Sequence, residues 1–256
     1  MTAETHAGAA SPARAIAAMT ATELRLALRR GENLFATIVI PTIVLVLFST
    51  LAIVPTGAAR PVEFLLPGSI ALGIIATSLV SLGITTAYDR SYGVLKRLGG
   101  SPLSRGELVA ARVLTVFVIE TVQVTLLVAV ASLALGWSPP GPVSPVGFVL
   151  TVLVGTAAFA GLGLWLAGTL RAETVLALAN VLFLGFLVVG GVIVPIDRLP
   201  EPMAAVAGAL PAAPLSALLR TALGAAPGTD VAGQLILLGA WALVSLLIAA
   251  RTFRWE

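Results

Sequence analysis

Six long runs of apolar residues constrain this chain more than any other feature of its sequence. A helix needs about 20 apolar residues, at ~1.5 Å per residue, to cross the hydrocarbon core of a membrane. The runs lack the polar alternation of barrel strands, so they predict helices. They fall at about 34–54, 64–87, 113–136, 146–170, 174–194 and 231–250.

The composition agrees with a membrane protein. Of the 256 residues, 58% are hydrophobic and only 11% are charged, whereas soluble domains carry about 25% charged residues. We therefore expect an all-α membrane protein with six transmembrane helices, in which 1–33 form a cytoplasmic tail with an amphipathic helix and 34–256 form one transmembrane domain. The chain has no cysteine and one histidine, His6, so neither thiol chemistry nor a metal site is expected. Basic residues flank the apolar runs and form no stripe, which argues against nucleic-acid binding.

The basic residues also predict the orientation of the helices. Lys and Arg in short loops are retained on the cytoplasmic side. With both termini in the cytoplasm, twelve of the fifteen basic residues fall in cytoplasmic segments, and only Arg60, Arg198 and Arg220 lie outside. We therefore expect a multi-pass protein of the plasma (inner) membrane with both termini cytoplasmic.

The segment before the first span predicts a short helix. Thr20 and Glu23 have the spacing of a capping box, which would start a helix at Thr20. Leu24 and Leu28 would share one face and the arginines another, which favours a helix on the inner leaflet among anionic lipid headgroups. A solvated lead-in is the open alternative.

The segment between spans five and six contains two apolar pieces, 202–210 and 215–223, that are too short to cross, at ~14 Å each. Pro211 and Pro214 would break a continuous helix between them. We expect two short re-entrant helices in the outer leaflet, with a surface loop as the alternative.

The polar stretch from Tyr88 to Arg112 holds five of the fifteen basic residues and separates spans two and three. The pattern predicts a helix over 88–98 that Gly99 and Gly100 end, and a second helix that a Ser104/Glu107 capping box starts. A charged helix-turn-helix of this kind suits force transmission to a cytoplasmic partner. A simple cytoplasmic anchor without a partner is the open alternative.

This stretch carries a resemblance to a known family. The matching parts are Asp89-Arg90, Gly93, the Leu-Lys-Arg-Leu run 95–98, and Ser101-Pro102-Leu103-Ser104-Arg105, together with a late Pro-Leu…Arg motif from Pro214 to Arg220. It resembles the cytoplasmic signature of type-2 ATP-binding-cassette exporter permeases, including the daunorubicin-resistance and multidrug-efflux group. Val94 and Tyr92 depart from the residues common at those positions in that family.

The resemblance implies a permease subunit of a bacterial ATP-driven exporter that moves a hydrophobic drug-like or lipidic substrate out of the cell. It would form a homodimer or pair with a paralogous permease. The chain would bind no cofactor and would be no enzyme, because ATP and Mg would sit on a separate ATPase subunit; the sequence has no phosphate-binding loop. The expected ATPase contacts of this coupling segment (88–112) are Asp89, Arg90, Tyr92, Gly93, Leu95, Lys96, Arg97, Leu98, Pro102 and Leu103.

Polar residues within the spans are scarce. Glu120 is the only acidic residue in a span, Gln123 shares its helix face, and Asn180 lies in the fifth run. Each is either part of a substrate path or a buried hydrogen-bonding group. Two other functions stay open, a proton-coupled secondary exporter that uses Glu120 and a membrane scaffold that transports nothing.

Overall fold

The computed structural model describes residues 11–29, 31–51, 58–99, 104–226 and 230–252, with the backbone alone at 31–36, 98–99 and 105. Within these ranges every regular element is helical. In chain order the elements are α1 (Pro12–Arg29), α2 (Gly31–Leu51), α3 (Pro61–Ile74), the π-helical segment η1 (Ile75–Ser81), α4 (Leu82–Ser91), α5 (Val94–Gly99), α6 (Arg105–Ala134), α7 (Pro145–Thr169), α8 (Ala172–Val189), the 3₁₀ turn η2 (Ile196–Arg198), α9 (Glu201–Ala209), α10 (Ala212–Ala222) and α11 (Val231–Thr252).

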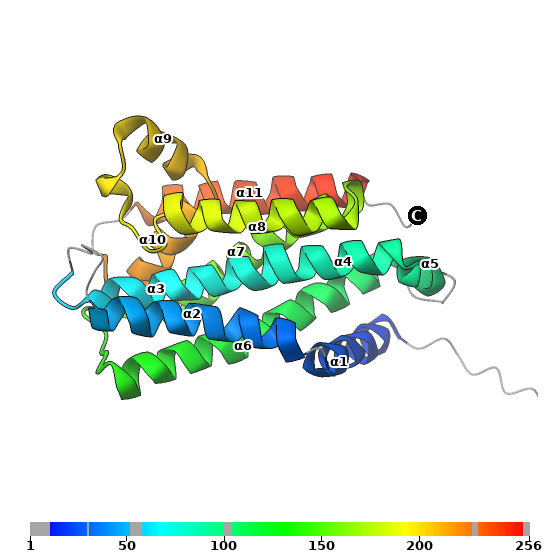
Figure 1. Ribbon diagram of the computed structural model, residues 1–256, viewed down its shortest axis with the longest axis horizontal. Helices are drawn as coiled ribbons and strands as arrows, with labels where there is room; N and C mark the ends of the chain where they lie inside the picture. The colour runs from blue at the N-terminus through cyan, green and yellow to red at the C-terminus, as the bar shows by residue number, and fades with distance from the viewer. Residues whose placement is uncertain (1–10, 30, 52–57, 100–103, 227–229, 253–256) are drawn as a thin grey trace, which may run out of the picture.

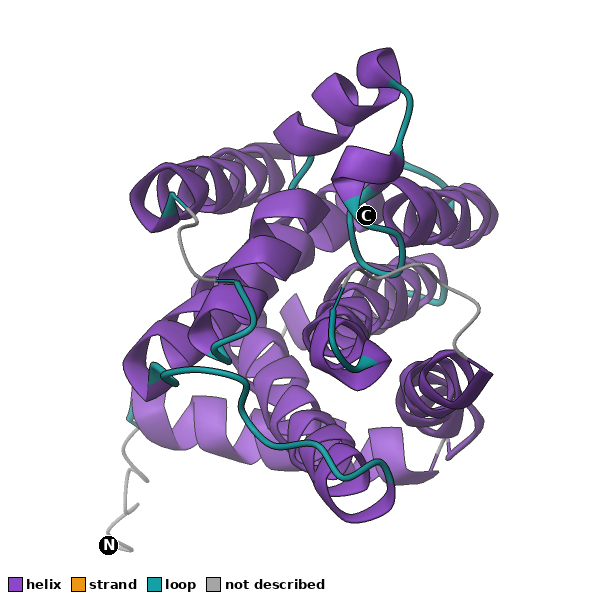
Figure 2. Cartoon of the chain, turned by 90° about the vertical axis from the view of Figure 1, so that its left-hand side faces the viewer, coloured by secondary structure: helices purple, strands orange, loops and turns teal. Residues whose placement is uncertain are grey.

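The long helices run side by side as one bundle (Figure 1). Viewed along the bundle, several of them appear almost end-on (Figure 2). One end carries α1, α5, the short connection between α7 and α8 and the last turn of α11; we refer to it as the α5 end. The opposite end carries η2, α9 and α10 and is referred to as the α9 end.

The helix Pro61–Ser91, formed by α3, η1 and α4 without a break, is the central member of the bundle. It contacts α2, α6, α7, α8 and α10. Its most apolar window is 83% buried, against 28%, 22% and 17% for α6, α8 and α11. The largest part of the hydrophobic core therefore surrounds this one helix.

Five helices of the described chain are long and apolar enough to cross a membrane: Pro61–Ser91, Gly106–Ala134, Pro145–Thr169, Ala172–Val189 and Val231–Thr252. These are spans two to six of the expected six, and they confirm an all-α multi-pass membrane protein. The helix expected over 34–54 is α2, whose described apolar part, Thr37–Leu51, is shorter. The two short helices expected between spans five and six are α9 and α10, which meet at a bend of 79°.

The first helix does not begin where the capping-box spacing predicted. It begins at Pro12, so Thr20 and Glu23 lie in its interior. Both residues instead reach across to α6: the Thr20 hydroxyl donates to the carbonyl of Ala111 at 3.4 Å, and Glu23 pairs with Arg112. The prediction of a helix start at Thr20 was wrong because tertiary contacts, not a helix cap, engage these two side chains.

The helix predicted over 88–98 is also interrupted earlier than expected. α4 ends at Ser91, and α5 begins at Val94 after a turn at Tyr92 and Gly93. Gly93 adopts a φ of +70°, a conformation that glycine reaches without steric cost. The second expected start is confirmed, because the Ser104 side chain accepts from the backbone N–H of Glu107 and the Glu107 carboxylate accepts from that of Ser104.

Candidate functional site

Two cavities flank the central helix at the level of η1 and α4. The larger, of about 570 Å³, lies between α2, the central helix and α8, and we name it the lateral cavity. The smaller, of about 370 Å³, lies between α1, α2, the central helix and α6, and we name it the α1 cavity. The residues that line both are Thr37, Ser81, Thr85 and Asp89. One helix therefore forms the wall between two cavities.

The lining of the lateral cavity combines aliphatic and aromatic side chains with several polar ones, and an aromatic pair lies at its α5 end. Tyr88 and Tyr92 stack with their ring centroids 5.9 Å apart. Asn180 lines the same cavity from α8 and donates its amide to the carbonyl of Leu176 in its own helix, at 2.7 Å. Of the three residues predicted on a substrate path, Asn180 is the one that lines a cavity.

Glu120 and Gln123 line neither cavity and are buried between helices. The carboxylate of Glu120 accepts hydrogen bonds from the hydroxyl of Ser78 in η1, at 2.6 Å, and from that of Thr156 in α7. The amide of Gln123 donates to the carbonyl of Thr37 in α2 at 2.7 Å. Both residues face the same side of α6, as predicted, and both join helices to one another.

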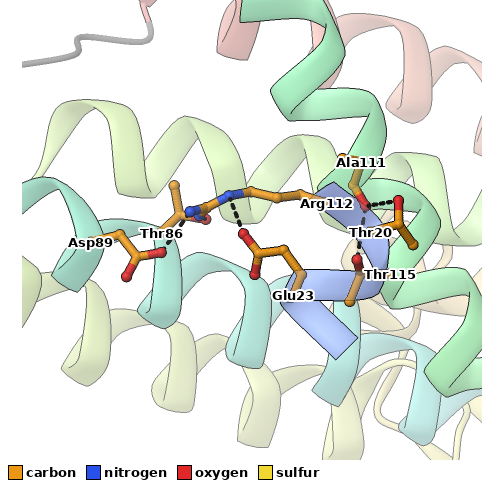
Figure 3. Close-up of polar contacts among 7 residues, drawn as sticks. All are labelled: Thr20, Glu23, Thr86, Asp89, Ala111, Arg112 and Thr115. Carbon is orange, nitrogen blue, oxygen red and sulfur yellow. Dashed lines mark hydrogen bonds and ion pairs between the residues drawn. The ribbon is translucent and has the colours of Figure 1, made fainter. Parts of the chain in front are cut away.

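Arg112 is the centre of a polar cluster that ties α1, α4 and α6 together (Figure 3). Its guanidinium lies 2.5 Å from the carboxylate of Asp89 and 3.5 Å from that of Glu23, and it donates to the hydroxyl of Thr86 at 2.5 Å. Only 4% of the Arg112 side chain is exposed. Such a charge is stable in the interior because carboxylates compensate it.

The expected ATPase contacts divide into two groups. Asp89 and Arg90 point into the bundle, since Asp89 pairs with Arg112 and Arg90 donates to the carbonyl of Leu170 between α7 and α8. Leu95 was expected on the contact surface but is fully buried. The outward-facing members are Tyr92, Lys96 and Arg97.

The other expected contacts belong to neither group. Gly93 forms the turn between α4 and α5. The side chain of Leu98 and the whole of Pro102 and Leu103 lie outside the described residues. The contact itself stays a prediction for all of these positions.

The late motif, Pro214 to Arg220, lies in α10 and contacts neighbouring segments at the α9 end. Arg220 donates to the carbonyl of Gly191 at 2.5 Å, and its guanidinium lies 3.7 Å from the centre of the Phe64 ring in α3. Pro214 is buried in the first turn of α10. Backbone N–H groups of a first turn have no partner within the helix, so a proline there removes no helical hydrogen bond. The motif therefore joins α10 to the central helix and to the segment that follows α8.

Sequence reasoning missed the role of Arg112, which it counted only as a cytoplasmic charge. A signal was present: Arg112 opens an apolar run, and a buried arginine requires a carboxylate partner. The identity of the partners depended on α1 folding back onto α6, which no local pattern encodes.

The helices and cavities described above define a multi-pass membrane protein built around an enclosed central helix. Residues 14–223 match the model of the ABC-2 type transporter family, and the chain belongs to that family. It is thus a permease component of an ABC transporter, a transport subunit of a kind that generally partners with an ATPase subunit. No curated protein matches the chain.

Proposed function

We propose that this chain is the permease subunit of an ATP-driven exporter and that its α5 end receives the force of a separate ATPase subunit. One observation carries the proposal. The wall of both cavities, α4, leads through a single turn into α5, whose Lys96 and Arg97 are exposed. A displacement of α5 would therefore be transmitted directly to α4, which lines both cavities.

The polar contacts of α4 support this transmission. Asp89 joins α4 to α6 through Arg112, and Arg90 joins it to the connection between α7 and α8. When a partner pushes on α5, these contacts make α4 move together with its neighbours. The lateral cavity, which lies between α2, α4 and α8, would then change its opening, as alternating access requires.

The lining of the lateral cavity favours a hydrophobic drug-like or lipidic substrate. Ile40, Val80, Ile84, Leu176 and Phe183 supply large apolar side chains to its walls. Hydroxyl groups, the Asn180 amide and two tyrosine rings accompany them, and such a mixture of apolar area with a small number of polar groups is typical of sites for amphipathic, largely apolar ligands. The daunorubicin-resistance and multidrug-efflux group is the part of the family that fits such a lining, and a second permease chain would complete the transporter.

The test is association with an ATP-binding-cassette ATPase encoded beside this chain. We expect the double variant Lys96→Glu/Arg97→Glu to reduce co-purification and to abolish stimulation of ATP hydrolysis by the permease. Arg251→Glu, an exposed arginine at the same end on α11, is the matched control and should keep both. Undiminished association and stimulation in the double variant would reject the contact.

Leu95 is unsuitable for this test, because a charge at a fully buried position would disturb folding rather than the contact. The proton-coupled alternative gains no support from the geometry, since Glu120 lines neither cavity. Transport into vesicles that is driven by a proton gradient without ATP would nevertheless favour that alternative over the proposal.

A further inference from the structure

The central helix contains a segment with unusual hydrogen bonding. Residues Ile75–Ser81 form a π-helix, seven residues long, between the α-helical segments α3 and α4. A π-helical turn holds one residue more than the α-helix around it, and such turns occur frequently at functional sites. Its loss would rotate α4 relative to α3 by about 100°, the angle that one residue adds to an α-helix.

This segment is also the partition between the two cavities. Thr77 faces the α1 cavity, whereas Ala76 and Val80 face the lateral cavity, and Ser81 lines both. A rotation at η1 would therefore exchange the side chains that the two cavities present. Thr85 and Asp89 of α4 and Thr37 of α2 also line both cavities.

Two buried side chains of α6 contact the partition directly. Glu120 accepts from the hydroxyl of Ser78 at 2.6 Å. The amide oxygen of Gln123 lies 3.4 Å from the hydroxyl of Thr77, which also donates to the carbonyl of Gly73 in its own helix at 2.9 Å. Each is held from its other side, Glu120 by Thr156 of α7 and Gln123 by the Thr37 carbonyl of α2. The Ser78–Glu120 hydrogen bond fixes the direction in which η1 faces α6, which a plain apolar interface would not do, and Gln123 contacts the preceding residue, Thr77.

Two glycines, one in α7 and one in α3 of the central helix, allow close packing around η1. A Cβ at Gly163 of α7 would lie 2.8 Å from the carbonyl oxygen of Ser78 and 2.9 Å from that of Leu79. A Cβ at Gly73 would lie 2.5 Å from the amide nitrogen of Gln123. The packing around η1 thus fits the π-helical form closely on both sides.

We propose that η1 is a switchable partition between the α1 cavity and the lateral cavity, and that Glu120 and Gln123 are the positioning residues that hold it in the π-helical form. When these contacts are released and the contacts of Asp89 and Thr86 with Arg112 also open, the turn converts to the α-helical form and α4 rotates. The inference concerns this chain alone and stands whether or not an ATPase drives the switch.

The experiment measures distances in the purified full-length chain. Because the chain has no cysteine, spin labels attach only at introduced positions. The reporter pair is Ser91→Cys with Glu173→Cys, on the exposed ends of α4 and α8, and the reference pair is Glu173→Cys with Arg251→Cys, which omits α4. A turn of about 100° moves a side chain at ~5 Å from the helix axis by several ångströms, within reach of the method.

Two substitutions should release the switch: Glu120→Leu removes both acceptors, and Ser78→Ala removes the hydroxyl on η1. Both should give a second distance population for the reporter pair and an unchanged reference pair. Deletion of Ala76 removes the extra residue of the π-turn, so that η1 becomes α-helical while α4 keeps its orientation, and the reporter pair should keep one distance close to the original. Glu120→Gln, which keeps hydrogen bonds to both hydroxyls, should restore the single original distance.

The control substitution is Thr121→Val, next to Glu120 but exposed and bonded only within its own helix. It should leave both pairs unchanged. A single unshifted reporter distance in both Glu120→Leu and Ser78→Ala would overturn the proposal. So would equal shifts in both pairs, because they would mean general loss of packing rather than rotation of α4.

Discussion

At the scale of single residues, the charged side chains of the motif 88–112 have two separate tasks. Arg112 and Asp89 are turned inward and hold helices together, whereas Lys96 and Arg97 remain exposed. A buried arginine stabilises the fold only while carboxylates compensate its charge. The stability of the α5 end should therefore depend on Arg112 far more than on the exposed basic residues around it.

We expect Arg112→Ala to lower the free energy of unfolding in detergent by about 3 kcal/mol. This value is at the low end for a broken buried pair, because Glu23 and Asp89 are partly exposed and can regain some hydration. Arg251→Ala, at an exposed position, should change it by less than about 0.5 kcal/mol. Denaturant unfolding of both variants checks this, and equal losses would contradict a special role for Arg112.

At the scale of elements, α7 packs against the central helix and α11 through small residues. Gly163 lies against the carbonyls of η1, and Gly83 of α4 approaches the Cα of Gly163, so that the helix backbones are close together. On the other side, the Ser245 hydroxyl of α11 donates to the carbonyl of Ala158 at 3.0 Å. Close backbone approach of this kind is how helices associate in a membrane, where burial from water gives no drive.

Gly163→Ala should therefore destabilise the protein by about 1–3 kcal/mol, because the added methyl group would clash with backbone carbonyls that cannot move aside. Gly185→Ala, within α8 and in open space, is the matched control. It should be neutral or should stabilise the helix by up to about 1 kcal/mol. Thermal unfolding of the two variants in the same detergent compares them directly, and a larger loss at Gly185 would refute the packing role.

At the scale of the whole molecule, charge is distributed unequally between the two ends of the bundle. Arg14, Lys96, Arg97, Arg171 and Arg251 are exposed at the α5 end, whereas Arg60 and Arg198 lie at the α9 end with Arg220. Basic residues are retained in the cytoplasm during insertion. The α5 end is accordingly expected to face the cytoplasm.

Single cysteines test this orientation without interference, because the chain has none of its own. In intact cells a membrane-impermeant thiol reagent should label Glu201→Cys, on the exposed surface of α9, and leave Lys96→Cys unlabelled. After the membrane is permeabilised, both should react. Labelling of Lys96→Cys in intact cells would reverse the predicted topology and remove the ATPase contact from the cytoplasm.

The class of fold followed from the sequence because it depends on local properties. The apolar runs are long enough to require helices that satisfy their own backbone hydrogen bonds in a membrane, and the boundaries of α7 and α11 lie within two residues of the predicted runs. The short connection between α7 and α8 also followed from the spacing, because the predicted runs 146–170 and 174–194 left only three residues between them, although α8 begins earlier, at Ala172.

The functional geometry was decided by tertiary structure. The sequence determined that Glu120, Arg112 and Asp89 were present, but only the packing of α1, α4 and α7 against α6 set their partners. The same packing selected a π-helical turn at Ile75–Ser81, where nothing in the local pattern distinguishes it from an α-helix. Asp89 and its partner Arg112 lie 23 positions apart in the chain, and Glu23 and Arg112 lie 89 positions apart. Because those contacts join segments remote in sequence, they exist only once the helices have come together.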